Sequence, residues 1–263
     1  MKVIITRPLA QAQVLAARVE RAGYEALIQP AIAISPVLDG APLDAALARL
    51  ESFQLVVFVS PNAVAGALAR LQRPWPAGVA IGVMGPGSVA ALAAHGLTAP
   101  DCRILVPPGA TEVEQPRFDS EALFDQIQTI LPPGGRVLII KGNGGRPWLA
   151  QRLASIGCQV ELAESYRREK PRVEAAVADI VRQLVAARQP ASVLVTSSEG
   201  LDNLQELIVG MAGAAGLDWL RACALLVPHA RIAENATAAG FQRVVLTGPG
   251  DENIVRALES EGQ

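Results

Sequence analysis

The sequence has few of the residues that usually bind metals or form disulfides. Its three cysteines, Cys102, Cys158 and Cys223, are odd in number and far apart, without C-x-x-C spacing. This pattern indicates neither a disulfide framework nor a zinc site, and it fits a reducing compartment. Only two histidines are present, His95 at an expected helix end and His229 in an expected strand-to-helix loop. We therefore expect no metal site and a cytoplasmic protein.

An excess of charge of one sign is also missing. The chain has 23 Lys and Arg residues against 25 Asp and Glu, a net charge of −2. This balance creates no long-range field for nucleic acid or an anionic membrane. The first apolar run ends at Arg7 and Pro8, too early for a secretory signal. The uncharged stretch 74–100 is interrupted by prolines and glycine, which indicates strand, loop and helix. We expect binding to neither nucleic acid nor membrane, so an anionic ligand must be held by local contacts.

Motifs for nucleotide cofactors and hydrolase nucleophiles are missing or incomplete. The chain has no G-x-x-x-x-G-K-[ST] loop and no G-x-S-x-G elbow. GPGSVA, which contains Gly85, Gly87 and Ser88, has the spacing of a dinucleotide fingerprint. The strand expected after it, from Arg103, does not end in an acidic residue that would hold a ribose. We therefore expect no cofactor.

Short apolar runs, tight loops and helical Ala/Leu-rich segments alternate along the chain. Hydrophobic residues make up 51% of the sequence, and this rhythm is typical of βα units in a parallel sheet. The expected strand-to-helix junctions are ITRPLA, VSPNAV, MGPGSV, IKGNGGRP, TSSEGL, VPHARI and TGPGDE. Each places small or capping residues before a helix, whose first N–H groups are free. Such junctions lie at the carboxyl edge of a sheet, where open α/β folds bind ligands.

The sequence contains an internal repeat. KVIITRPLAQAQ aligns without gaps with RVLIIKGNGGRP, and further along this alignment Gly23 falls on Gly157. VFVSPNAV aligns with LVTSSEGL when Ser60 is placed on Ser197. The repeat predicts a duplicated α/β unit that forms two similar lobes.

An unusually long extended stretch follows the first helix of each repeat. These stretches are residues 24–37 and 158–171, whereas a strand normally has about five or six residues. We expect them to be linker strands at which the chain crosses twice between lobes, leaving a cleft. Tyr166 lies on the second crossing.

The loop KGNGGRP is a candidate anion site. Its glycines, among them Gly142 and Gly144, surround Asn143, and Lys141 and Arg146 flank them with positive charges. This combination suits a carboxylate or phosphate. A solvated βα loop with no ligand is the alternative.

Several polar residues at the junctions have two interpretations. Each of these residues can be a helix N-cap or a ligand contact, and the two roles are compatible: Ser60, Asn62, Ser88, Ser197 and Ser198. His229 is likewise either a ligand contact or an ordinary loop residue.

Tyr166 is one of only two tyrosines and stands in ESYRRE between acidic and basic residues. One interpretation is an amphipathic side chain on an exposed linker strand. The other is functional, because a phenol stays protonated at neutral pH and can donate a proton or a hydrogen bond to a leaving hydroxyl.

The motifs ITRP, VFVSPNAV, GPGS, GNGGR, ESYRRE and VLVTSSEG, in this order, resemble the uroporphyrinogen-III synthase family. The resemblance implies an α/β fold of two flavodoxin-like lobes with parallel sheets, joined by a two-stranded linker. It implies a discontinuous domain 1, residues 1–36 and 171–263, and a domain 2, residues 37–170. It also implies a cofactor-free cytoplasmic lyase, a hydro-lyase that closes hydroxymethylbilane to uroporphyrinogen III, inverting ring D through a spiro intermediate.

In the site that follows from this resemblance, Tyr166 is the catalytic acid. The substrate-binding residues are Arg7, Ser60, Asn62, Gly85, Gly87, Ser88, Lys141, Gly142, Asn143, Gly144, Arg146, Ser197, Ser198 and His229. The family more often has Ser or Thr at the position of His229. We expect a monomer whose partner is this small-molecule substrate. The alternative function is a non-catalytic cytoplasmic two-lobed binding protein or sensor for a small anionic ligand.

Overall fold

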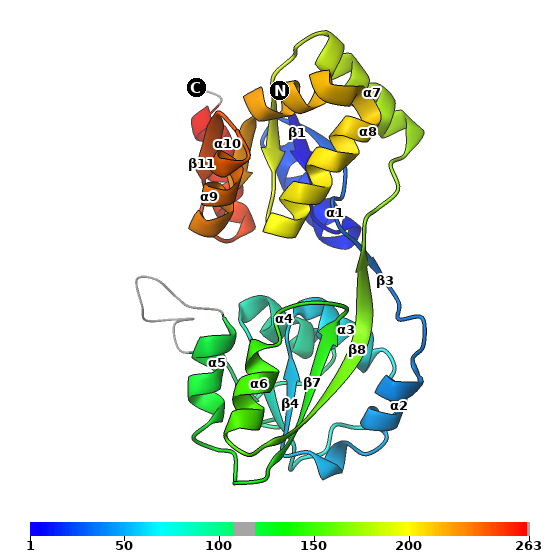
Figure 1. Ribbon diagram of the computed structural model, residues 1–263, viewed down its shortest axis with the longest axis vertical. Coiled ribbons are helices and arrows are strands. Elements are labelled where there is room, and N and C mark those ends of the chain that lie inside the picture. The colour runs from blue at the N-terminus through cyan, green and yellow to red at the C-terminus, as the bar shows by residue number, and fades with distance from the viewer. Residues whose placement is uncertain (108–118, 262–263) are drawn as a thin grey trace. The chain divides into compact units, whose positions relative to one another are not determined.

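A computed structural model gives the structure of the protein and describes residues 1–107 and 119–261. The chain folds into two compact units, which Figure 1 shows in ribbon form. Unit 1 consists of Met1–Ala33 and Glu169–Gln263, and unit 2 consists of Ile34–Arg168. Unit 1 is therefore built from both ends of the chain, whereas unit 2 is one continuous segment.

Unit 1 is a five-stranded parallel sheet with the strand order β11-β10-β9-β1-β2. Its strands are β1 (Lys2–Ile5), β2 (Glu25–Ile28), β9 (Ala191–Leu194), β10 (Ala224–Val227) and β11 (Arg243–Leu246). Its helices are α1 (Leu9–Arg21), α7 (Ala175–Ala186), α8 (Ser198–Ala222), α9 (Ala230–Ala238) and α10 (Asp251–Glu261).

Helices cover both faces of this sheet. Side chains alternate along each strand, so Val3 and Ile5 of β1 pack in one cluster with residues of α1 and α10. Ile4 lies on the other face, in a cluster with residues of α7, α8 and α9. Both faces are buried, as is typical of parallel sheets.

Unit 2 contains a six-stranded sheet with the order β3-β8-β7-β4-β5-β6. Its strands are β3 (Ala33–Ser35), β4 (Leu55–Phe58), β5 (Ala80–Val83), β6 (Ile104–Leu105), β7 (Arg136–Gly142) and β8 (Gln159–Glu169). Its helices are α2 (Ala41–Leu47), the short 3-10 helix η1 (Leu50–Ser52), α3 (Pro61–Leu68), α4 (Pro86–Ala94), α5 (Ser120–Ile127) and α6 (Trp148–Ser155). The side chains of α2, α3 and α4 form the core on one face of this sheet, and those of α5 and α6 form the core on the other.

The two sheets confirm the internal repeat. Gly23 and Gly157 both follow a helix, with φ of 86° and 87°, a left-handed conformation that glycine adopts without strain. Ser60 and Ser197 both cap a helix by accepting a hydrogen bond from the backbone N–H three residues later. In this alignment, β2-β1-β9-β10-β11 of unit 1 corresponds to β8-β7-β4-β5-β6 of unit 2.

Both sheets thus have the flavodoxin-like order 2-1-3-4-5. The chain enters the two sheets at different strands, because unit 2 begins its common core at β4, the counterpart of β9. The topology of unit 2 is therefore a circular permutation of that of unit 1, with β3 added at the edge.

The two long extended stretches differ from each other. Residues 24–37 are not one strand: β2 and β3 belong to different sheets and are separated at Pro30, which has no N–H group to continue a ladder. Residues 158–171 instead contain β8, a single strand of 11 residues. A two-stranded linker between the units stays a prediction.

All the predicted strand-to-helix junctions are confirmed, since each one connects a strand directly to a helix. The uncharged stretch 74–100 forms β5 and α4, and His95 is the C-cap of α4. Within the described parts of the chain, no helix has the length and apolar character needed to span a membrane.

Candidate functional site

A pocket of about 390 Å³ opens in unit 2 at the carboxyl ends of β4, β5 and β7. The predicted site residues in its wall are Ser60, Lys141, Gly142, Asn143, Gly144, Arg146 and Tyr166. They come from the loops after β4 and β7 and from β8, as the position of ligand sites in open α/β sheets leads us to expect.

Tyr166 is a buried residue of unit 2, with 6% of its surface exposed. Its ring belongs to the hydrophobic cluster that contains α3 and α4 side chains. Its hydroxyl oxygen lies 3.0 Å from the hydroxyl oxygen of Ser60. The interpretation of Tyr166 as an amphipathic side chain on an exposed linker strand is therefore wrong, because the ring is packed and the hydroxyl has a defined partner.

Ser60 connects Tyr166 to the start of α3. Its side chain accepts a hydrogen bond of 3.1 Å from the backbone N–H of Ala63, as an N-cap residue does. Since this N–H engages one lone pair, the Ser60 hydroxyl still has a proton and a second lone pair for the phenol. The Ser60 and Tyr166 hydroxyls thus form a short hydrogen-bonded chain at the positive end of a helix.

The loop after β7 contains two cations in different environments. Arg146 forms two hydrogen bonds to the Glu121 carboxylate, of 3.0 and 3.2 Å. Lys141 is half-buried, and no hydrogen bond or ion pair joins its ammonium group to the residues that the structure describes. Lys141 is therefore the better placed of the two to bind a carboxylate in the pocket.

Asn143, in the pocket wall, is held by contacts with β8. Its side-chain amide donates to the backbone carbonyl of Arg168 at 3.2 Å and accepts from the Arg168 N–H at 2.6 Å. This bidentate contact extends the pairing of β7 with β8 beyond the end of β7.

The remaining predicted residues of unit 2 lie around the first turns of α3 and α4. Asn62 is the second residue of α3, Gly85 precedes α4, and Gly87 and Ser88 lie within its first turn. A Cβ atom at Gly87 would lie 3.4 Å from Pro61, so the two helix starts are neighbours. None of these four residues lines the pocket.

The capping interpretation is correct for Ser60 and Ser197 only. Asn62, Ser88 and Ser198 already lie inside helices. Ser88 is buried, with 3% of its surface exposed.

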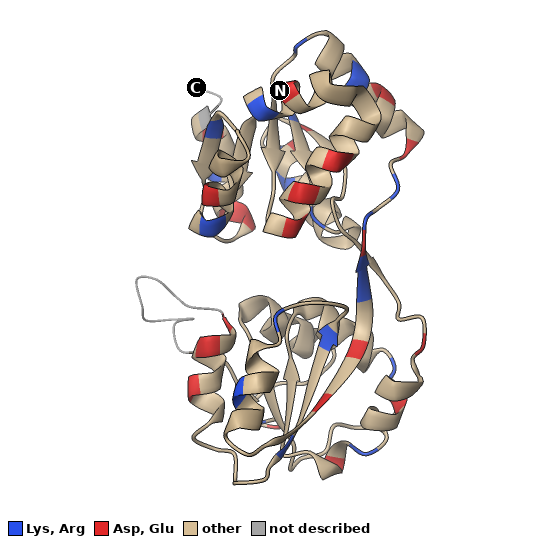
Figure 2. Cartoon of the chain, viewed as in Figure 1, with Lys and Arg blue, Asp and Glu red and all other residues tan. Residues whose placement is uncertain are grey.

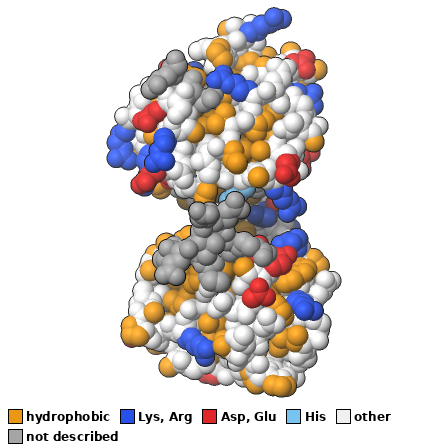
Figure 3. Space-filling view, turned by 90° about the vertical axis from the view of Figure 1, so that its left-hand side faces the viewer, with side chains coloured by type: hydrophobic (Ala, Val, Ile, Leu, Met, Phe, Trp, Pro, Cys, Tyr) orange, Lys and Arg blue, Asp and Glu red, His pale blue; other side chains and the backbone are white. Residues whose placement is uncertain are grey.

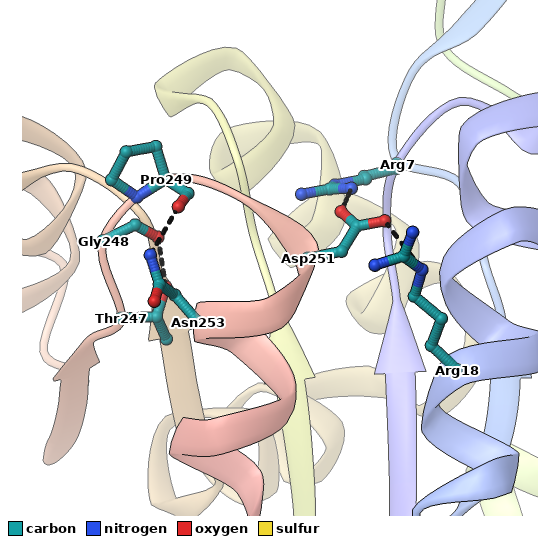
Figure 4. Close-up of polar contacts among 7 residues, drawn as sticks. All are labelled: Arg7, Arg18, Thr247, Gly248, Pro249, Asp251 and Asn253. Carbon is teal, nitrogen blue, oxygen red and sulfur yellow. Dashed lines mark hydrogen bonds and ion pairs between the residues drawn. The ribbon is translucent and has the colours of Figure 1, made fainter. Parts of the chain in front are cut away.

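In unit 1 the predicted site residues have partners of their own. Arg7, after β1, donates a hydrogen bond of 2.6 Å to Asp251, the first residue of α10. Arg18 of α1 lies 3.9 Å from the same carboxylate, on the side away from Arg7's contact oxygen (Figure 4). The charge of Arg7 is thus largely neutralised within the protein. Ser198 accepts a hydrogen bond of 2.7 Å from Asn235.

Ser197 and His229 lie immediately before α8 and α9. Ser197 accepts a hydrogen bond of 3.0 Å from the Gly200 N–H. His229 is exposed and occupies an N-cap position, but its side chain makes no capping hydrogen bond. The structure therefore leaves the His229 ring accessible to solvent.

Charges of both signs are interspersed over both units (Figure 2). The face shown in Figure 3 likewise mixes charged, hydrophobic and other side chains. Among the residues described, no three His, Cys, Asp or Glu side chains lie close enough together to hold a metal ion. Local contacts, such as those around Lys141, therefore determine what the pocket attracts.

Sequence reasoning missed part of the pocket wall. Asp119, Ser120 and Met84 line it, and Asp119 caps α5 by accepting a hydrogen bond of 2.8 Å from Ala122. An acidic residue before a helical Ser-Glu pair is a recognisable helix start. The run DSEA therefore contained this signal, whereas nothing in the sequence marks Met84.

The two permuted flavodoxin-like units, with a pocket of polar and apolar residues at a carboxyl sheet edge, define an α/β protein with a candidate small-molecule site. A family model described as Uroporphyrinogen-III synthase HemD matches residues 13–255. The chain belongs to the uroporphyrinogen-III synthase family.

Curated relatives agree with this family. The chain is 32% identical to the uroporphyrinogen-III synthase of Escherichia coli (strain K12) in an alignment of 265 residues. The alignment covers 98% of this chain and all of the relative. It is 29% identical to the corresponding protein of Synechococcus elongatus over 225 residues, 82% of this chain and 77% of that one.

Solved structures show the same fold. The uroporphyrinogen III synthase of Thermus thermophilus, in a mutant form, matches with a TM-score of 0.60 and 18% identity over 99% of each chain. The enzyme of Helicobacter pylori 26695 matches with a TM-score of 0.56 and 13% identity over 99% of each chain. The family and its relatives favour an enzyme over a non-catalytic binding protein.

Proposed function

We propose that the protein closes hydroxymethylbilane to uroporphyrinogen III, with inversion of ring D and loss of water, and that it is a lyase. Its family and its full-length similarity to uroporphyrinogen-III synthases support this reaction. The observation that carries the proposed mechanism is the hydrogen-bonded pair of Tyr166 and Ser60 in the wall of the unit 2 pocket.

In this mechanism Tyr166 assists the departure of the terminal hydroxyl of the substrate. The phenol donates its proton or a hydrogen bond to the leaving oxygen, while the Ser60 hydroxyl donates to the phenol oxygen as negative charge develops there. Loss of the hydroxyl as water leaves an electrophilic azafulvene on ring A. The substituted α-carbon of ring D attacks it to give the spiro intermediate, which fragments and recloses with ring D reversed.

Lys141 serves substrate binding in this proposal. The substrate carries many carboxylates, and Lys141 offers an ammonium group without an acidic partner in the described parts of the chain. Arg146 is already bound to Glu121, so we assign it a smaller part.

The size of the pocket limits what it holds. A volume of about 390 Å³ is at the lower end of the range of small-molecule sites, about 300 to 1,000 Å³. We infer that it takes the reacting end of the four-ring substrate and not the whole molecule. Orienting that end so that the crowded carbon attacks is then the main catalytic task.

The proposed function is tested by incubating the purified protein with enzymatically generated hydroxymethylbilane and separating the product isomers. We expect the type III isomer, formed without added metal or nucleotide and unaffected by a chelator. Formation of only the symmetrical type I isomer, as in the reaction without protein, would contradict the proposal. Heat-denatured protein serves as the control for spontaneous closure.

A further inference from the structure

A β-bulge precedes the position of Tyr166 in unit 2. Strands β7 and β8 pair in constant register from Arg136 with Gln159 up to Lys141 with Glu164, but the next pair is Gly142 with Tyr166. Ser165 is therefore an extra residue on β8 with no counterpart on β7. Bulges of this kind redirect the side chains that follow them.

The bulge decides on which face of the sheet Tyr166 lies. Ala163 packs on the face of α3 and α4, whereas Val160 packs on the face of α5 and α6, as regular alternation requires. Continued alternation would place residue 166 with Val160. Instead, Tyr166 lies in the same cluster as Ala163, which brings its hydroxyl to Ser60.

Two sets of contacts hold the bulge. On the α3 side, the Ser165 hydroxyl donates to the backbone carbonyl of Ala63 at 3.2 Å. On the β7 side, the Asn143 N–H donates to the carbonyl of Tyr166 at 3.3 Å, and the Asn143 side chain binds both backbone groups of Arg168. Asn143 therefore contacts the backbone of β8 at Tyr166 and again two residues later.

We infer that Asn143 is a positioning residue, whose amide fixes the backbone of β8 after the bulge and so directs the Tyr166 hydroxyl to Ser60 and the pocket. This inference rests on the proposed function and replaces the substrate-binding role predicted for Asn143. The amide oxygen and one amide N–H are both engaged by Arg168. Asn143 thus acts on the reaction through Tyr166.

Kinetics of Asn143→Ala test this role. We expect kcat to fall about 10- to 100-fold, since a displacement of about 1 Å in a reacting group has effects of this size, with KM unchanged. In the Tyr166→Phe background, Asn143→Ala should cause no further loss, because the hydroxyl that it positions is already absent. A multiplied loss in the double variant, or a raised KM, would show that Asn143 acts on the substrate and would overturn the inference.

A second readout does not depend on activity. The chain has only two tyrosines, so selective isotope labelling gives separate ring NMR signals for Tyr24 and Tyr166. We expect Asn143→Ala to shift the Tyr166 signals and to leave those of Tyr24, in unit 1, unchanged. Unshifted Tyr166 signals would overturn the inference.

Asn203→Ala is the matched control. Asn203 donates from its side chain to the Ala31 carbonyl at 3.0 Å, a side chain to backbone contact within unit 1. We expect it to leave kcat and the Tyr166 signals as in wild type, and an equal loss of kcat in both variants would overturn the specific role of Asn143. If wild-type protein forms no type III isomer, the proposed function fails, while the NMR comparison still tests the Asn143 contact.

Discussion

The phenol ring of Tyr166 occupies the space that a side chain at position 142 would fill. A Cβ atom on Gly142 would lie 2.6 Å from the ring carbon that carries the hydroxyl. Gly142 was predicted as part of an anion-binding loop. The structure gives another reason for glycine at this position, because the Tyr166 ring leaves no room for a side chain. The pocket wall therefore depends on a residue without a side chain.

Gly142→Ala should consequently displace Tyr166. We expect kcat to fall at least about tenfold because the hydroxyl moves away from Ser60. The free energy of unfolding should fall by about 1 to 3 kcal/mol, as is usual when a packed core receives an extra methyl group. Gly78→Ala is the control, since apart from its chain neighbours no atom of the described residues lies within 4 Å of a Cβ atom there. A Gly142→Ala variant with wild-type activity would show that the ring position is unimportant.

Tyr166→Phe removes the hydroxyl and keeps the ring. We expect kcat to fall by about ten- to a thousandfold, the contribution of one general acid or hydrogen bond, with little change in stability. Residual product should still be the type III isomer, because chain folding and not the acid selects the isomer. Tyr24→Phe is the matched control, since the Tyr24 hydroxyl donates to the backbone carbonyl of Leu258 at 2.8 Å in unit 1. Full kcat in Tyr166→Phe would reduce Tyr166 to a packing residue.

The two cations of the loop after β7 should differ in their effect on KM. Lys141→Ala should raise KM strongly with little effect on kcat, since a charge that holds a peripheral carboxylate binds substrate and transition state alike. Arg146→Ala should raise KM less, because Arg146 is bound to Glu121. Steady-state kinetics of both variants decide the order, and a larger KM for Arg146→Ala contradicts the assignment.

Asp251→Asn should destabilise unit 1. Only 15% of the Arg7 side chain and 21% of the Asp251 side chain are exposed, so loss of the acid leaves a poorly solvated guanidinium. We expect the free energy of unfolding to fall by about 1 to 3 kcal/mol, measured by urea denaturation. Glu25→Gln, in the more exposed ion pair with Lys2, should have a smaller effect. Equal effects would mean that burial of the Arg7 pair contributes nothing.

Cys223 should contribute to the loss of stability at high pH. Burial raises the pKa of its thiol from 9.0 to about 11. Between pH 9 and 11 the unfolded chain therefore releases this proton before the folded protein does, and stability falls as pH rises through this range. Cys223→Ala should make the decline of the unfolding free energy with pH shallower than in wild type. An unchanged slope would show that the thiol titrates alike in both states.

Much of the fold was predictable because local signals agreed with the repeat. β-branched runs followed by small or capping residues marked the junctions, and Gly23 and Gly157 marked equivalent helix ends. The extended stretch 24–37 was predicted as one linker strand but contains two strands. Pro30 marks the break between them, because proline cannot donate to a β-ladder.

The caps show where sequence reasoning lost precision. Pro61 and Pro86 occupy the first position of α3 and α4, where proline needs no hydrogen-bond partner for its nitrogen. The cap must then be the residue before the proline, which is Ser60 in α3 and Gly85 in α4. The position of Pro86 therefore excludes Ser88 as the cap of α4. The presence of a polar residue near the junction is not enough to identify a cap.

The catalytic candidate was found from residue type, but its environment was not. Tyr166 is a rare phenol on a long strand, and this suggested chemistry. Its burial depends on the extra residue Ser165, and regular alternation of side chains does not reveal a bulge. The contact of Asn143 with Arg168 was equally hidden, because it joins the loop after β7 to a residue of β8 that is distant in sequence.

The circular permutation of the two units has a consequence for the order in which the chain folds during synthesis. Unit 2 is complete once residue 168 has left the ribosome, since all its strands lie in one continuous segment. The first strand of the protein pairs early with β2 but must wait for its other neighbour, because Lys2 of β1 also pairs with Ala191 of β9, which follows unit 2 in the chain. Domains generally fold as units when their last segment emerges. We therefore expect the middle of this protein to fold first, while the nascent N-terminal segment, β1 to β2, stays without its neighbouring strand and is the part most in need of chaperones.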